Sequence, residues 1–111
     1  MNFQKTIILG RLTGDVRIEE VSNVGKRARF SVAVNEKFID KRGVNQENTE
    51  FFNVVALGKL AEVVFENIEK SDTVFIEGRL KTREWESGGA TKKNIELFAD
   101  KIQWIKIDKV K

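Results

Sequence analysis

The hydrophobic pattern around Gly58 changes its period, and it indicates a strand that runs directly into a helix. Before Gly58 apolar and polar residues alternate with the two-residue period of a strand, and apolar side chains fall on both faces. After Gly58, Leu60, Val64 and Ile68 recur at the spacing of one helical face, and we expect the helix to end near Lys70. One face of the strand can fill a core, so the other face must contact a partner or form an exposed aromatic surface.

Other segments also have the alternation of strands, and the clearest is residues 26–38, where Ala28, Phe30, Val32 and Val34 share one face. Polar and basic side chains occupy the opposite face of this segment. We expect strands at residues 3–12, with an irregular continuation at 16–21, and at residues 26–38, 50–57, 73–85 and 93–105. The last of these is expected to face inward with Ile95, Leu97 and Ala99. Turns are expected at residues 22–25 and 87–90, and residues 40–49 are predicted to form a long mobile loop.

The order of these elements predicts an all-β fold. Five strands with one helix between the third and fourth form the five-stranded barrel of the oligonucleotide/oligosaccharide-binding (OB) fold. The length fits one domain over residues 1–111, with the last ~6 residues frayed. This fold binds ligands on the face of its second and third strands and with its loops.

The absence of cysteine and histidine removes several classes of site at once. Zinc sites, disulfides, thiol chemistry and histidine-dependent dyads all need one of these residues. The acidic residues are spread over turns and exposed strand faces, so we expect no carboxylate cluster for magnesium. We therefore expect no catalytic residue, no metal and no cofactor. The chain has no apolar run near the ~20 residues that span a bilayer and no secretory signal, so we expect a cytoplasmic protein without membrane contact.

Charge alone does not identify a ligand. The formal net charge is +3, from 20 basic and 17 acidic residues, which is only mildly basic. An interpretation as a nucleic-acid binder must therefore rest on where the cations lie.

Three aromatic residues fall where a core does not need them: Phe38, Phe51 and Trp85. Lys81, Arg83 and Trp85 share one strand face by their spacing, and this mixture of rings and cations is typical of sites for single-stranded nucleic acid. Unpaired bases stack on such rings at ~1–3 kcal/mol each, with little preference for sequence. We expect the three rings to lie on one face of the barrel.

Each of these signals also has an ordinary structural interpretation. Phe38 could anchor a loop, Phe51 could face a subunit interface, and Trp85 could be an isolated surface ring. Lys81 and Arg83 could be charges that protect an edge strand from aggregation. The remaining phenylalanines are assigned to the core or to subunit contacts, without a ligand role: Phe30, Phe52, Phe65, Phe75 and Phe98.

The chain resembles the bacterial single-stranded-DNA-binding protein family. The motifs that carry the resemblance are residues 8–13, 30–35, 51–53, 58–62, 76–83 and 99–104, in the family's order and over nearly the whole chain. The resemblance implies a homotetramer around which single-stranded DNA is wrapped, and stacking by Phe38, Phe51 and Trp85. It also implies phosphate contacts by a basic set: Arg11, Lys37, Lys59, Lys81 and Arg83.

The sequence departs from the family at three places. Leu57 stands where many members have an aromatic ring, and Ser71 replaces a usual glycine after the helix. The family's acidic tail, which recruits replication and repair enzymes, is not found among these 111 residues, so recruitment of such partners is left open.

These observations favour a sequence-tolerant binder of single-stranded DNA that acts in replication, recombination or repair at the nucleoid. Its log affinity is expected to fall with log salt by roughly 0.7 per phosphate neutralised. Two alternatives stay open: a primosome-type accessory protein of the same fold, and a protein-interaction module that uses Phe51 and Leu57 as its contact patch.

Overall fold

The fold, obtained as a computed structural model, is described for residues 1, 3–23 and 25–106. Within these residues the chain forms strands and one helix in an order that matches the expected OB layout. The elements are β1 (Thr6–Leu12), β2 (Arg17–Val21), β3 (Gly25–Ile39), β4 (Asn45–Leu57), α1 (Lys59–Asn67), β5 (Thr73–Ser87) and β6 (Ala90–Ile105).

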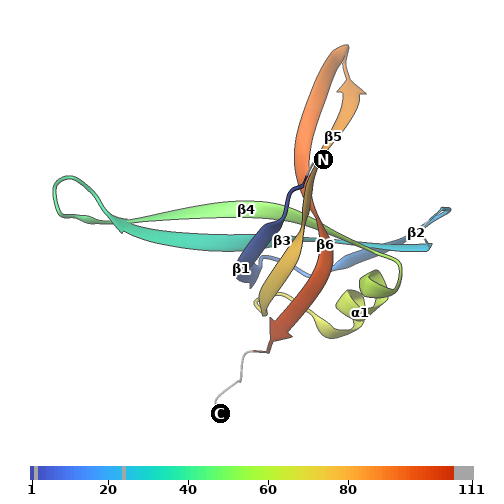
Figure 1. The fold of residues 1–111 in the computed structure, drawn as a ribbon, viewed down its shortest axis with the longest axis horizontal. Coiled ribbons are helices and arrows are strands. Elements are labelled where there is room, and N and C mark those ends of the chain that lie inside the picture. The colour runs from blue at the N-terminus through green and yellow to red at the C-terminus, as the bar shows by residue number, and fades with distance from the viewer. Residues whose placement is uncertain (2, 24, 107–111) are drawn as a thin grey trace.

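The strands form one sheet in the order β1-β5-β6-β4-β3-β2, and pairing of β1 with β3 closes it into a barrel. β4 and β6 pair in parallel, and every other strand pair is antiparallel. Because β1 and β2 are two pieces of the expected first strand, the prediction of a five-stranded OB barrel is confirmed. As expected, the helix α1 lies between β4 and β5 in the chain, and it packs against one end of the barrel (Figure 1).

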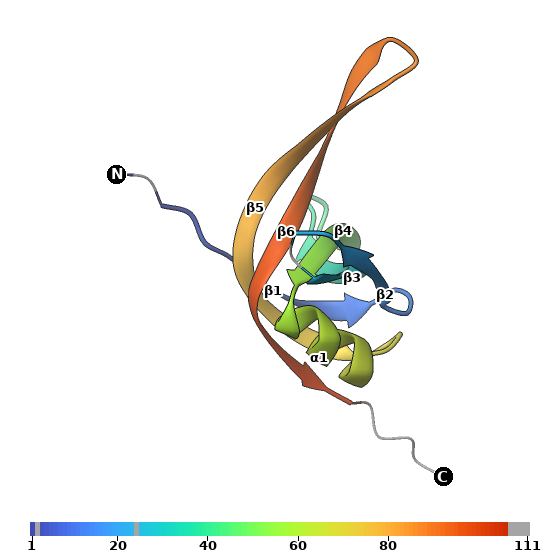
Figure 2. The same cartoon turned by 90° about the vertical axis from the view of Figure 1, so that its right-hand side faces the viewer.

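Two strand pairs extend beyond the barrel as ribbons. β3 and β4 stay paired from Arg27↔Leu57 to Ile39↔Asn45, and β5 and β6 stay paired out to Ser87↔Ala90. We call residues 35–49 the β3–β4 arm and residues 81–95 the β5–β6 arm. The two arms leave the barrel in different directions, as both views show (Figures 1 and 2).

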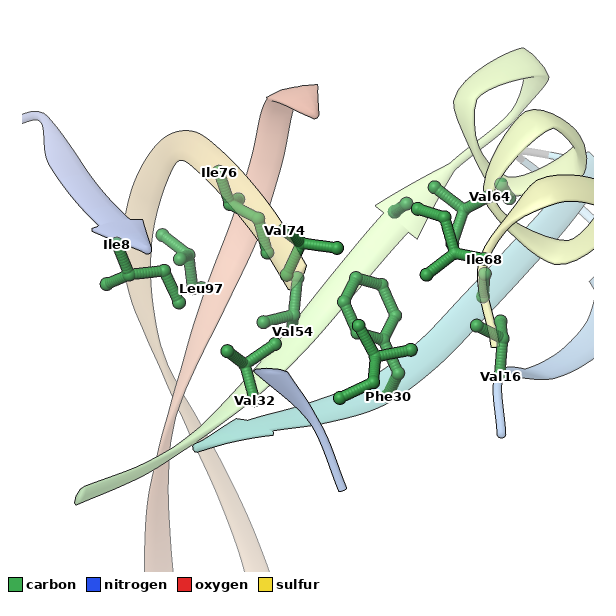
Figure 3. Close-up of a cluster of buried hydrophobic side chains, with 14 residues drawn as sticks. Ile8, Val16, Phe30, Val32, Val54, Val64, Ile68, Val74, Ile76 and Leu97 are labelled. Carbon is green, nitrogen blue, oxygen red and sulfur yellow. The ribbon is translucent and has the colours of Figure 1, made fainter. Parts of the chain in front are cut away.

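The core lies inside the barrel and under α1 (Figure 3). Phe30 stands in its middle, between a group that includes Ile76 and Leu97 and a group next to the helix that includes Val64 and Ile68. These side chains are at most 6% exposed, because every second strand residue points inward and Val64 and Ile68 lie on one face of the helix. The alternation in the sequence therefore predicted correctly that Phe30, Ile76 and Leu97 face the core.

The predicted mobile loop at residues 40–49 is wrong, because β4 already begins at Asn45. The turn that remains is closed by Asp40, whose Oδ1 accepts hydrogen bonds from the backbone N–H groups of Arg42 and Val44 at 2.9 and 3.0 Å. Gln46 donates a further bond to Oδ2. The bond from Val44, with those from Gln46 and Arg42, outweighs the effect of burial and lowers the pKa of Asp40.

The helix ends at Asn67, earlier than expected, and a tight turn connects it to β5. Ser71 adopts φ 78° in this turn, and it is the only non-glycine residue with positive φ among the described residues.

Asp72 follows in the same turn and contacts the C-terminal segment. Burial raises the pKa of Asp72, but Lys106 at 2.8 Å and the backbone N–H of Glu69 at 2.9 Å outweigh this effect and hold the pKa below its ordinary value. Of the terminus predicted to fray, Lys106 makes this contact, and residues 107–111 lie outside the described residues.

No helix in residues 1, 3–23 and 25–106 has the length and apolar character that crossing a membrane requires.

Candidate nucleic-acid interface

A groove of about 470 Å³ runs between the outer face of β3 and β4 and the base of the β5–β6 arm. Its floor is partly apolar, with Val55 and Leu57 from β4 and Phe98 from β6. Val55 pairs with Phe98 across the parallel β4–β6 ladder, so these side chains meet on the face that does not enter the core. Four cations line the groove: Arg27, Arg29, Lys81 and Arg83.

Neighbouring groups hold these cations in place. Arg27 donates from Nε to Glu19 at 2.8 Å, and this hydrogen bond lowers the pKa of the Glu19 carboxyl. On the opposite wall, Lys81 Nζ lies 4.5 Å from the centre of the Phe98 ring. Cations attract aromatic faces within ≈ 6 Å, so the ring orients the ammonium while leaving its three donors available.

The three rings predicted to stack with bases are all exposed. Phe38 is 53%, Phe51 67% and Trp85 40% exposed, so none is part of the core. Trp85 lies on the β5–β6 arm, and the guanidinium carbon of Arg83 stands 5.5 Å from its ring. Each ring therefore has a face that a base can reach.

The strand register places Phe38 and Phe51 on opposite faces of the ribbon formed by β3 and β4. Phe51 pairs with Ala33, on the outer face, whereas Phe38 belongs to the same alternate series as Phe30, which faces the core. The structure therefore does not gather the three rings onto one face. A ribbon of two strands is only ~5 Å wide between strand axes, so one extended ligand can still reach both faces.

The predicted basic residues are spread along this surface. Arg11 pairs with Ala33, which also pairs with Phe51, so Arg11 and Phe51 flank a small residue in one cross-strand row. Lys37 joins Phe38 in a second hollow, of about 440 Å³, on the β3–β4 arm. Lys59 is exposed at the first position of α1. Lys81 and Arg83 are the predicted cations that the groove brings together.

The groove also contains residues that the sequence analysis did not single out. Arg27 and Arg29 could have been found, because they alternate on the polar face of the clearest strand. Phe98 could not, because the parallel pairing of β4 with β6 that brings it into the groove has no local sequence signal. Phe98 lines the groove and is not a core residue, so the core alternative of its predicted assignment is wrong. The same holds for Phe65 and Phe75, which are 49% and 37% exposed.

The described residues contain no group of His, Cys, Asp or Glu side chains that could hold a metal ion. The groove presents cations, the Phe98 ring, hydrogen-bonding groups and the carboxylate of Glu96.

Comparison with known proteins gives a consistent result. The model of the single-strand binding protein family matches residues 3–105. A single-stranded DNA-binding protein of Aquifex aeolicus is 34% identical over 101 residues, which cover 91% of this chain and 69% of that protein.

Solved structures have the same fold. A deletion mutant of the single-stranded DNA binding protein from Thermus aquaticus matches with a TM-score of 0.81 and 27% identity over 92% of this chain, which spans only 50% of that one. A small single-stranded DNA-binding protein from Streptomyces coelicolor matches with a TM-score of 0.74 and 26% identity, covering 93% and 94% of the two chains. A Plasmodium falciparum protein in complex with single-stranded DNA has a TM-score of 0.84 at 24% identity, covering 97% of both chains, which is a likeness of fold.

Proposed function

Because the chain belongs to the single-strand binding protein family, we infer that it binds single-stranded DNA and carries out no chemical step on it. The observation that carries this inference is the groove lined by Arg27, Arg29, Lys81 and Arg83. Trp85 continues it along the β5–β6 arm. Phosphates bind the cations and release counterions, and unpaired bases stack on the rings.

We propose that the strand also contacts the β3–β4 arm. Phe51 and Arg11 lie on the outer face of the sheet, and Lys37 and Phe38 lie further out on the arm. Lys59 extends the basic surface past the end of β4. Each exposed ring supplies one stacking platform, and Leu57, in place of a ring, contributes only apolar contact.

Such binding protects exposed strands during replication, recombination or repair, and we propose this role at the nucleoid in the cytoplasm. The protein-interaction alternative, which would use Phe51 and Leu57, has less support, because Leu57 stands directly opposite Arg27 in the basic groove. A primosome-type accessory role would give weaker binding to the same ligand.

Titration with labelled oligo-dT and with a duplex of equal length tests the proposed function. We expect binding to the single strand only, with log affinity falling against log salt by roughly 0.7 for each phosphate neutralised. Equal binding of duplex, or affinity that does not depend on salt, would contradict the proposal.

Intrinsic fluorescence then identifies the stacking ring. Oligo-dT should quench the emission of the parent protein, and the Trp85→Phe variant should lose most of this quenching. The second tryptophan, Trp104, is partly buried against the core and serves as an internal reference. Quenching that persists unchanged in the variant would show that Trp85 is not a platform.

We further propose that the protein is a homo-oligomer, a tetramer by the family resemblance. Ile7 and Leu9 of β1 and Phe75 of β5 project from the outer face of the sheet with 54%, 58% and 37% exposure. Leu9 pairs directly with Phe75, so these residues form one continuous apolar patch. Patches of this kind commonly mark protein–protein interfaces.

A further inference from the structure

The β5–β6 arm has two faces of unequal charge. Its strands stay paired out to Ser87↔Ala90, and residues that pair across an antiparallel ribbon share a face. The face that carries Trp85 also carries Lys81, Arg83, Ser87, Ala90, Lys92 and Asn94. The opposite face carries Thr82, Glu84, Glu86, Thr91, Lys93 and Ile95. One face of the arm therefore holds three cations and no carboxylate, whereas the other holds two carboxylates and one lysine.

Lys92 lies on the Trp85 face and is the direct cross-strand partner of that ring. Side chains in such a pair start about 4.5–5.5 Å apart at their Cβ atoms. Lys92 is exposed, and it takes no part in the ion pairs that the described residues form. The guanidinium carbon of Arg83, on the same face, stands 5.5 Å from the centre of the Trp85 ring. The ring thus has one cation on its own strand and one on the neighbouring strand, which suits a stacked base with a phosphate beside it.

Lys93, the next residue, lies on the opposite face and is engaged by a carboxylate. Its Nζ stands 3.4 Å from Oε1 of Glu84, its cross-strand partner. Glu86 adds a second carboxylate to that face, and its own cross-strand partner is the uncharged Thr91. A phosphate that approached this face would meet like charge, which disfavours binding. The face carries no aromatic ring either, so it lacks both of the contacts by which a single strand is held.

We propose that single-stranded DNA binds only the Trp85 face of the β5–β6 arm, and that Lys92 contacts the phosphate beside the base on Trp85. Lys93 makes no such contact, although it is the neighbouring residue and of the same type. This inference rests on the proposed binding of single-stranded DNA, and it adds the path of the strand along the arm. The ligand follows one side of the ribbon, from Lys92 past Trp85 to Arg83, and does not wrap around it.

The affinity of the full chain for oligo-dT, measured over a range of salt, tests the two lysines against each other. Lys92→Gln removes one phosphate contact for each arm that the strand touches, so the slope of log affinity against log salt should become shallower by roughly 0.7 per arm. At about 0.1 M salt this corresponds to an affinity about fivefold lower per arm. Lys92→Arg keeps a phosphate-binding cation and should keep the parent slope.

Lys93→Gln is the matched control, because it removes the same charge from the adjacent exposed residue. Its slope should equal that of the parent protein. Circular dichroism melting of each variant checks that it is folded.

Single-cysteine variants give a second measurement that does not depend on charge. The chain contains no cysteine, so a thiol introduced at either position is the only one in the protein. In Lys92→Cys, saturating oligo-dT should slow alkylation of the thiol by iodoacetamide several-fold, because the strand covers that face. In Lys93→Cys, the same strand should leave the alkylation rate unchanged. These two variants decide the matter if Lys92→Gln does not fold.

The outcomes separate the two proposals. A shallower slope in Lys92→Gln alone, with protection of the thiol in Lys92→Cys alone, supports binding on one face. Equal effects at the two positions would mean that the strand wraps around the arm, and no effect at either would mean that it does not lie beside Lys92. Both results overturn this inference while the parent protein still binds oligo-dT. A parent protein that does not bind oligo-dT overturns the proposed function itself.

Discussion

Ser71 occupies a turn position whose backbone conformation is unfavourable for a residue with a side chain. Its φ of 78° is the left-handed region, which costs a residue with a Cβ roughly 1–2 kcal/mol and costs glycine nothing. The turn keeps this conformation because the N–H of Ser71 donates to the carbonyl of Leu12 at 3.0 Å, which ties the end of the helix to β1.

We therefore expect Ser71→Gly to stabilise the protein. Relief of strain outweighs the greater freedom of glycine in the unfolded chain, and the free energy of unfolding should rise by about 0.5–1 kcal/mol. Urea denaturation at matched protein concentration measures the change. Ser71→Ala keeps the Cβ and should give no gain; if alanine stabilises as much as glycine, the explanation by strain is wrong.

Single residues also show where the sequence misleads. Ile95, Leu97 and Ala99 were predicted to face inward, and Leu97 does so, with 1% exposure. Ile95 lies on the same face of β6 but is 60% exposed, because β6 has already left the barrel at that point and nothing covers it. A residue pattern predicts which face of a strand a side chain lies on, but it does not predict where the strand leaves the barrel and that face becomes exposed.

Among the elements, the pair β5–β6 depends on a glycine at its bend. Gly78 lies at a register shift, where Glu77 pairs with Lys101 and Gly78 pairs with Ala99. A Cβ on Gly78 would overlap the backbone carbonyl of Phe98 and lie 3.0 Å from the Cα of Ala99. This close approach of two backbones lets the strands close the barrel before they leave it as the β5–β6 arm.

Gly78→Ala should consequently destabilise the fold by about 2–3 kcal/mol, since the overlap is with backbone that cannot move aside. The measurement is the urea midpoint of the folded variant. Gly14→Ala is the control, because a Cβ at Gly14 meets nothing within 4 Å. A Gly78→Ala protein as stable as the parent would mean that the strands separate there at little cost.

The elements were predicted well where they border the core and poorly where they leave it. The strand at residues 26–38 was found nearly to its ends, because Phe30 and Val32 alternate with polar residues. Residues 45–49 were missed, because both faces of the β3–β4 arm meet solvent and impose no alternation. The exposed rings of the site were therefore found as exceptions to the core pattern, whereas Phe98 and Glu96 depended on a pairing between distant segments.

For the whole molecule, the apolar patch of β1 and β5 predicts the state of assembly. We expect the parent protein to have the mass of an oligomer by sedimentation, and Leu9→Glu to lower that mass, because a charge placed opposite Phe75 cannot be buried. Val44, at the turn of the β3–β4 arm, is likewise an exposed apolar residue. The control variant Val44→Glu should leave the mass unchanged. A monomeric parent protein would contradict the proposed interface.

The two arms have a consequence for which kind of nucleic acid the protein accepts. Since they diverge from the barrel, a polymer that touches the rings of both must change direction between them (Figures 1 and 2). Double-stranded DNA keeps its direction over about 150 bp, and sharp bending costs several kcal/mol. We therefore expect the two arms to disfavour duplex DNA because it is stiff, and to accept a flexible single strand.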